Sequence, residues 1–149
     1  MQTEVVMLDD EVMCQQLDAF LVERLYEFNS NVTGYFDAKL LGAAVRNESG
    51  EVIAGLSGYT WGGSAEISNF WVGERHRGRG LGTRILRAAE AEAIRRGCSQ
   101  VVLLSHSFQA PRFYEREGYQ RMVEIEGRPK GYSDIVFVKS LTAKRDDRK

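Results

Sequence analysis

The most informative part of this 149-residue chain is a glycine-rich, basic stretch, Arg77-Gly78-Arg79-Gly80-Leu81-Gly82-Thr83. Glycines let the backbone turn sharply and let its N–H groups approach a ligand closely. From Leu81 onward the apolar residues recur at helical spacing, and the start of a helix presents unpaired N–H groups and a positive partial charge. With Arg75, Arg77 and Arg79 beside it, the turn predicts an anion site. The alternative is a solvated basic loop whose glycines only turn the chain.

Two common phosphate-binding motifs fail here at particular positions. A P-loop needs Gly-Lys-Ser/Thr, but Gly82 is followed by Thr83 and Arg84. A dinucleotide fingerprint needs a third glycine where Thr83 stands. It also needs an acidic residue about 20 positions on, where the chain has Val101-Val102-Leu103-Leu104. Both nucleotide-binding classes are therefore disfavoured.

The residues on either side of the turn predict a mixed arrangement of helices and strands. Strand-like runs before it are joined by turn-forming residues, and the apolar face of the helix after it is followed by a buried, parallel-type strand. Residues 29–34 are expected to break the first helix. The expected strands are residues 4–8, 39–46, 52–61, 65–72, 100–105, 119–126 and 134–141, and the expected helices are residues 12–28, 81–96 and a short one from Pro111 to just before Gly118.

Composition limits the class of protein. The chain has 20 Lys and Arg against 21 Asp and Glu, which argues against a dedicated nucleic-acid binder. Its two cysteines, Cys14 and Cys98, do not form a disulfide scaffold, and no metal-ligand spacing is present. No signal peptide or membrane span is evident. We expect one cytoplasmic domain over residues 1–141, with a charged tail over residues 142–149, and no membrane, nucleic-acid or metal partner.

Two motifs in this order resemble those of the GNAT superfamily of N-acetyltransferases. The first is Gln/Arg-x-x-Gly-x-Gly/Ala at a helix start, matched by Arg77-Gly78-Arg79-Gly80-Leu81-Gly82. The second is Ala-x-x-Phe-Tyr-Glu-x-x-Gly-Phe/Tyr, matched from Ala110 to Tyr119. The resemblance covers nearly the whole chain. It implies an α/β (α+β) GNAT fold: a seven-stranded, mostly antiparallel mixed sheet with helices on both faces, whose fourth and fifth strands are parallel and splayed.

The same resemblance implies a site for acetyl-CoA as cosubstrate. Backbone N–H groups of Gly78, Gly80, Leu81, Gly82 and Thr83 would hold the pyrophosphate, with Arg77 and Arg79 nearby. The pantetheine would run along residues 65–72 and pair with main-chain groups of Phe70 and Val72, as an added strand would. A strand N–H of Phe70 or Trp71 would stabilise the thioester oxygen.

Tyr114 occupies the position where many family members keep a general acid. A phenol there would protonate the departing CoA thiolate as charge develops on the sulfur. The structural alternative is an aromatic side chain that packs the short helix onto the sheet.

The general base is less well defined by the sequence. An amine with a pKa near 10.4 is almost entirely protonated at pH 7, so its proton must be removed. Glu66 and His106 are the candidates, each with a structural alternative: a solvated strand residue and a sheet-edge histidine. Some family members place a glutamate where this chain has Val102. Deprotonation relayed by water therefore stays open.

The expected reaction is direct transfer, in a ternary complex, to a primary amine of a small molecule or peptide. Where the family often has an asparagine that contacts the pantetheine, this chain has Ser107, which could keep a weaker hydrogen bond. Residues 29–37 and 127–133 are expected to wall the acceptor pocket. A non-catalytic CoA-binding regulatory module is the alternative function, and the resemblance also allows a homodimer.

Overall fold

The computed structural model describes residues 3–142. The expected tail from residue 143 onward lies outside the described residues. The contacts within the chain divide it into two compact units, with the boundary between Phe36 and Asp37. Each unit is described by itself.

The first unit holds one long helix, α1 (Glu11–Thr33). The Asp10 side chain caps its start by accepting a hydrogen bond from the N–H of Met13 at 2.8 Å. The helix continues through residues 29–33, of which all but Val32 are polar, so the expected break there is wrong. Polar residues cost a helix only a few tenths of a kcal/mol each. The helix ends where Gly34 adopts φ 79° and donates to the carbonyl of Ser30.

The expected first strand at residues 4–8 is also wrong, because these residues have no regular structure. An apolar run becomes a strand only when another strand pairs with it, and the sheet order begins with β1, whose outer edge has no partner strand among the described residues. The sheet therefore has six strands, where seven were expected.

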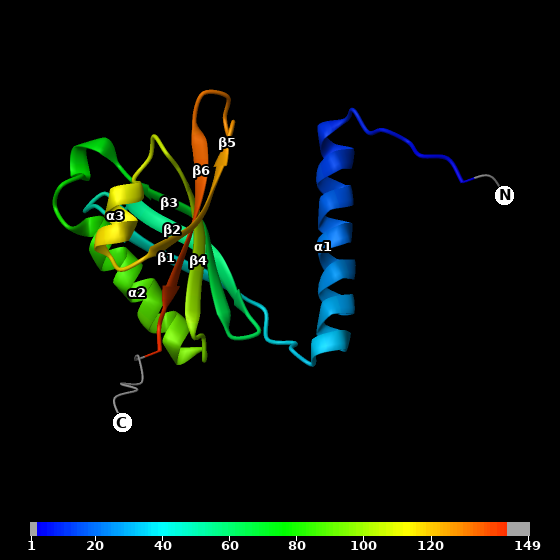
Figure 1. Cartoon of the computed structure of the whole chain (residues 1–149), viewed down its shortest axis with the longest axis horizontal. Coiled ribbons are helices and arrows are strands. Elements are labelled where there is room, and N and C mark those ends of the chain that lie inside the picture. Colours follow the sequence, from blue (N-terminus) through cyan, green and yellow to red (C-terminus); the bar gives the residue numbers. More distant parts are fainter. Residues whose placement is uncertain (1–2, 143–149) are drawn as a thin grey trace. The chain divides into compact units, whose positions relative to one another are not determined.

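The second unit is built around that sheet, in the order β1-β2-β3-β4-β6-β5 (Figure 1). All neighbouring pairs are antiparallel except β3 with β4, which are parallel as expected. Its elements are β1 (Lys39–Arg46), β2 (Val52–Trp61), β3 (Ser64–Val72), the 3₁₀ turn η1 (Glu74–His76), α2 (Leu81–Arg95), β4 (Gln100–His106), α3 (Pro111–Arg116), β5 (Gln120–Glu126) and β6 (Ser133–Ser140).

Helix α2 buries the predicted face against β1, β2 and β3, with Ile85, Leu86, Ala89 and Ala93 all in the core. Its first turn lies beside α3 (Figure 1), where the Thr83 hydroxyl donates to a carboxylate oxygen of Glu117 at 2.7 Å. This hydrogen bond joins the start of α2 to the residue that follows α3.

A buried ion pair fastens the middle of α2 to β6. The ammonium group of Lys139 lies 3.0 Å from both carboxylate oxygens of Glu90, and the hydroxyl of Tyr119 donates to one of them. Glu90 is only 8% exposed, so its negative charge depends on these partners. The pair therefore contributes to stability mainly by keeping each buried charge compensated.

We expect Glu90→Gln to lower the free energy of unfolding by about 2 kcal/mol, because Lys139 loses its counter-charge while the side-chain volume is kept. Urea unfolding followed by circular dichroism measures this. Glu48→Gln, in the exposed turn between β1 and β2, is the matched control and should leave the midpoint unchanged. Equal midpoints for the two variants would contradict the expectation.

Candidate active site

The glycine turn forms the start of α2 in the conformation its sequence predicts. Gly78 and Gly80 both have positive φ, 72° and 73°, and Gly80 is the residue that caps the helix. The N–H groups of the first helical turn have no acceptor within the helix, so they face whatever lies beyond its end. The guanidinium Nε of Arg77 donates to the carbonyl of Val72 at 3.0 Å and ties the turn to the end of β3.

A cavity of about 770 Å³ opens beyond this helix end. It runs between the last residues of β3, the glycine turn and the start of α3. Its lining residues are Phe70, Trp71, Val72, His76, Arg77, Gly78, Gly80, Leu81, Gly82, Thr83, Ser105, Phe108, Gln109, Ala110, Phe113, Tyr114 and Arg116.

Strands β3 and β4 are joined only over their first halves. The parallel register runs from Ser64 opposite Gln100 to Ile67 opposite Leu103 and then stops. Beyond it, the second half of β3 pairs with β2 on its other side and has no strand partner toward β4. Backbone groups of successive residues point to opposite edges of a strand, and the N–H of Gly73 donates to Ile53 of β2. The backbone groups of Phe70 and Val72 therefore face the open edge beside the cavity, and those of Trp71 face β2.

Tyr114 lies in the cavity wall and is 7% exposed. Aromatic rings surround it, with centroids between 5.2 and 6.3 Å from its own, and its hydroxyl has no hydrogen-bond partner among the described residues. Removal from water raises its pKa to about 12. The side chain thus packs α3 onto the sheet and also presents a protonated phenol to the cavity.

The two candidate bases differ in their surroundings. Glu66 lies opposite Val102, where β3 and β4 are still paired, and the hydroxyl of Tyr59 donates to its carboxylate at 2.6 Å. That hydrogen bond, with desolvation and the charge of the carboxylate, raises the pKa of Tyr59 to about 12. His106 lies at the end of β4, past the last β3–β4 pair. Neither residue lines the cavity itself.

Three of the expected cosubstrate residues have contacts or positions that sequence did not foretell. The hydroxyl of Thr83 donates to Glu117, so it is the backbone N–H of Thr83 that remains for a ligand. The Ser107 hydroxyl accepts from the N–H of Ser133 at 3.1 Å, so it joins the end of β4 to β6. Arg79 and Ser107 are not among the cavity's lining residues.

The cavity also has lining residues that sequence reasoning missed. His76 and Arg116 add side chains that can carry positive charge near the turn, and Phe108 and Gln109 form the wall after β4. The Gln109 side-chain oxygen accepts from the backbone N–H of His106 at 2.9 Å. The basic, glycine-rich surroundings were the available signal for His76. The wall after β4 had none, because it depends on how the loop folds back.

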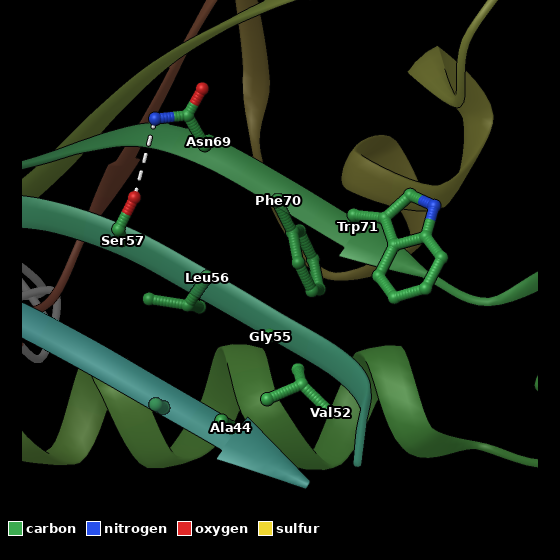
Figure 2. A pocket seen from close by; sticks show the side chains of 9 residues that line it. Ala44, Val52, Gly55, Leu56, Ser57, Asn69, Phe70 and Trp71 are labelled. Carbon is green, nitrogen blue, oxygen red and sulfur yellow. Dashed lines mark hydrogen bonds between the residues drawn. The ribbon is translucent and has the colours of Figure 1, made fainter.

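A second, shallower hollow of about 290 Å³ lies across β1, β2 and β3, where Phe70 and Trp71 line it as well (Figure 2). The side-chain amide of Asn69 donates to the Ser57 hydroxyl at 3.2 Å along its rim. No charged side chain of residues 3–142 lines this hollow, so the described part offers no group there that would hold a phosphate.

Among residues 3–142 no group of three or more His, Cys, Asp or Glu side chains is placed to hold a metal ion. No helix in this described part is long and apolar enough to cross a membrane.

The open mixed sheet with its one parallel pair, and the glycine-capped helix beside the cavity, are the arrangement that the resemblance in the sequence implies. The profile of the Acetyltransferase (GNAT) family matches residues 6–119. The chain belongs to this GNAT acetyltransferase family, and it is an acyltransferase enzyme.

Individual relatives agree with this assignment. The chain is 37% identical over 95 residues to a blasticidin-S acetyltransferase of Streptomyces morookaense, covering 63% of this chain and 70% of the relative. It is 33% identical over 98 residues to an acetyltransferase of Agrobacterium fabrum, covering 66% and 72%. A crystal structure of an acetyltransferase from Bacillus cereus superposes with a TM-score of 0.77 at 26% identity, covering 92% of this chain and 97% of that one.

Proposed function

We propose that this enzyme transfers the acetyl group of acetyl-CoA to a primary amine of a small molecule or peptide, directly and in a ternary complex, with residues 1–141 acting as one catalytic domain. The observation that carries the proposal is the free helix end of α2 opening into a cavity whose wall includes the Tyr114 phenol. The cavity wall thus combines a helix start that suits a phosphate with a proton donor.

The glycine turn would bind the pyrophosphate through the N–H groups of Gly78, Gly80, Leu81, Gly82 and Thr83. Backbone N–H groups at a helix start favour negative charge without needing a lysine. Arg77 is held close by its hydrogen bond to Val72, Arg116 in the cavity wall adds positive charge, and Arg79 lies within the turn itself. These groups support a doubly charged ligand in this place.

The open edge of β3 would bind the pantetheine arm and place the thioester near Tyr114. Main-chain groups of Phe70 and Val72 can pair with amides in an extended ligand, and the N–H of Phe70 can stabilise the oxyanion of the tetrahedral intermediate. The N–H of Trp71, the other candidate, faces β2. Tyr114 would then donate its proton to the sulfur as the carbon–sulfur bond breaks. Cys98 does not take part, because it precedes β4 at the end opposite the cavity and burial raises the pKa of its thiol.

The acceptor would lose a proton to Glu66, to His106 or through water before its nitrogen attacks. A relative that is named for acetylating blasticidin-S supports a small-molecule acceptor. Loop residues 127–133 would wall the acceptor site, and Ser107 fixes their position through Ser133. Of the other expected wall residues, Asp37 accepts from the N–H of Gly62 at 3.0 Å.

Calorimetric titration with acetyl-CoA, CoA and ATP, followed by thiol-release assays over a panel of amines, tests the proposal. We expect micromolar binding of acetyl-CoA, no binding of ATP, and thiol release that rises with at least one amine. Binding without turnover of any amine would favour the alternative of a CoA-binding regulatory module. The engaged hydroxyl of Ser107 and the valine at position 102 are the features that favour this alternative. No binding of CoA would overturn both functions.

A further inference from the structure

His106 lies where the two parallel strands have separated. Ile67 and Leu103 are the last residues that pair across β3 and β4, and His106 is the final residue of β4, three positions further on. Side chains alternate along a strand, and the buried Ser105 lines the cavity that holds Tyr114. The side chain of His106 therefore leaves β4 on the side opposite to that of Ser105, and it is 34% exposed.

The hydrogen bonds of the imidazole determine which of its nitrogens can accept a proton. Nδ1 lies 3.0 Å from the backbone carbonyl oxygen of Arg128. A carbonyl oxygen can only accept, so in the neutral ring Nδ1 carries the hydrogen and Nε2 carries the lone pair. Nε2 has no protein partner among the described residues. The Phe108 ring stacks on the imidazole at 5.2 Å with an interplanar angle of 8° and fixes its plane.

A buried carboxylate lies behind the same nitrogen. Asp134, with a side chain only 5% exposed, places Oδ1 3.5 Å from Nδ1 of His106. Its other oxygen lies 3.5 Å from Nε of Arg128, whose guanidinium is exposed. A carboxylate at this distance stabilises the imidazolium that forms when Nε2 takes up a proton.

We propose that His106 is the general base of the acetyl transfer and that Asp134 is the residue that positions its imidazole; this inference rests on the proposed function. Asp134 on β6 is the strand partner of His106 on β4, although the two residues lie far apart in the sequence. Glu66 is less suited, because its carboxylate already accepts a 2.6 Å hydrogen bond from Tyr59 and lies where the strands are still closed.

Nε2 of His106 takes one proton from the acceptor's ammonium group and later releases it to solvent. The freed nitrogen pair forms the new carbon–nitrogen bond, and the carbon–sulfur bond breaks with its electrons on sulfur. Tyr114 protonates the sulfur, and the second proton lost by the nitrogen restores Tyr114 through solvent. The net products are an N-acetyl amide, free CoA thiol and one proton.

Asp134→Asn tests the role of the carboxylate through its separate effects on kcat and KM. Among the described residues, Asp134 lies against the imidazole and Arg128 lies against Asp134. The substitution removes the negative charge beside Nδ1 that stabilises the imidazolium formed during the transfer. We expect kcat to fall about tenfold, with KM for acetyl-CoA unchanged.

Glu126→Gln is the matched control, because it removes a carboxylate from an exposed neighbouring position on β5 and should leave kcat and KM unchanged. An unchanged kcat in folded Asp134→Asn, a rise in KM for acetyl-CoA that accounts for the loss, or the same fall in kcat in Glu126→Gln would overturn the role of Asp134.

His106→Ala provides a second measurement that does not depend on the folding of the Asp134 variant. We expect kcat to fall about 100-fold and added imidazole to restore part of it, while Glu66→Gln keeps most of the activity. Full activity of His106→Ala, or a greater loss in Glu66→Gln, would overturn the inference. A wild-type protein that acetylates no amine would instead overturn the proposed function.

Discussion

Tyr114→Phe will lower kcat by about 100-fold or more while the Kd for CoA stays within about twofold. The general acid contributes about two to four orders of magnitude to rates of this kind, and phenylalanine keeps the packing of the ring. With a pKa of about 12, the phenol keeps its proton across the neutral range. The phenol can still donate to the sulfur, because the proton moves only as the carbon–sulfur bond breaks and negative charge develops there.

Thiol-release kinetics and calorimetry with CoA measure the two quantities. Tyr119→Phe is the matched control: its ring lies 5.8 Å from that of Tyr114, but its hydroxyl is bonded to Glu90. This control should lose about 1 kcal/mol of stability and keep its turnover. Unchanged kcat in Tyr114→Phe would contradict the role of an acid and leave Tyr114 as a packing residue.

Gly58→Ala will lower the free energy of unfolding by about 3 kcal/mol or more. A Cβ atom at Gly58 would lie 1.9 Å from the carbonyl oxygen of Glu66 and 2.9 Å from its carbonyl carbon. Both are backbone atoms of the neighbouring strand, so relief requires β2 and β3 to separate beside the point where β3 leaves β4. Overpacking of this kind usually costs about 1–3 kcal/mol and more where backbone must move.

Urea unfolding measures the effect, and Gly42→Ala on β1 is the matched control. Its Cβ would meet only the carbonyl oxygen of Leu56 at 4.0 Å. The control should change stability by less than about 1 kcal/mol, because alanine lowers the entropy of the unfolded chain and nothing opposes it in the fold. Similar stability losses in the two variants would contradict the prediction, because the backbone of β3 at Glu66 would then move away from the new Cβ at little cost.

Local patterns predicted most of the second unit. β1 and β2 begin and end at the expected residues, because the turn at residues 47–50 and strong alternation mark both limits. The helix after the glycine turn was equally clear, since its apolar spacing and Gly97 bound it. The strand predicted at residues 4–8 is absent, because an apolar run does not reveal whether a partner strand is available. The helix end predicted within residues 29–33 is wrong, because the helix ends at the left-handed Gly34 and not where polar residues begin.

The sequence predicted the parts of the candidate site that lie in contiguous motifs, and it missed the contacts that form between distant strands. The glycine turn and Tyr114 lie in contiguous motifs, and the structure brings both to one cavity. Asp134 lies 28 positions from His106 in the chain, and only the antiparallel pairing of β4 with β6 brings them together. The engagement of Ser107 by Ser133 depends on the same pairing. Such relations cannot be read from spacing, because they arise from the order of strands in the sheet.

Because β3 and β4 pair only over four residues of each strand, the sheet consists of two three-stranded halves, β1-β2-β3 and β4-β6-β5. Backbone amides of β3 that face the gap have no acceptor on β4, so their hydrogens should exchange with solvent faster than those facing β2. A ligand that occupies the gap would slow that exchange and stabilise the native state in proportion to its concentration, by about 2.7 kcal/mol at 100 times its Kd. Resistance to unfolding and to proteolysis should therefore depend on how much of the protein is loaded.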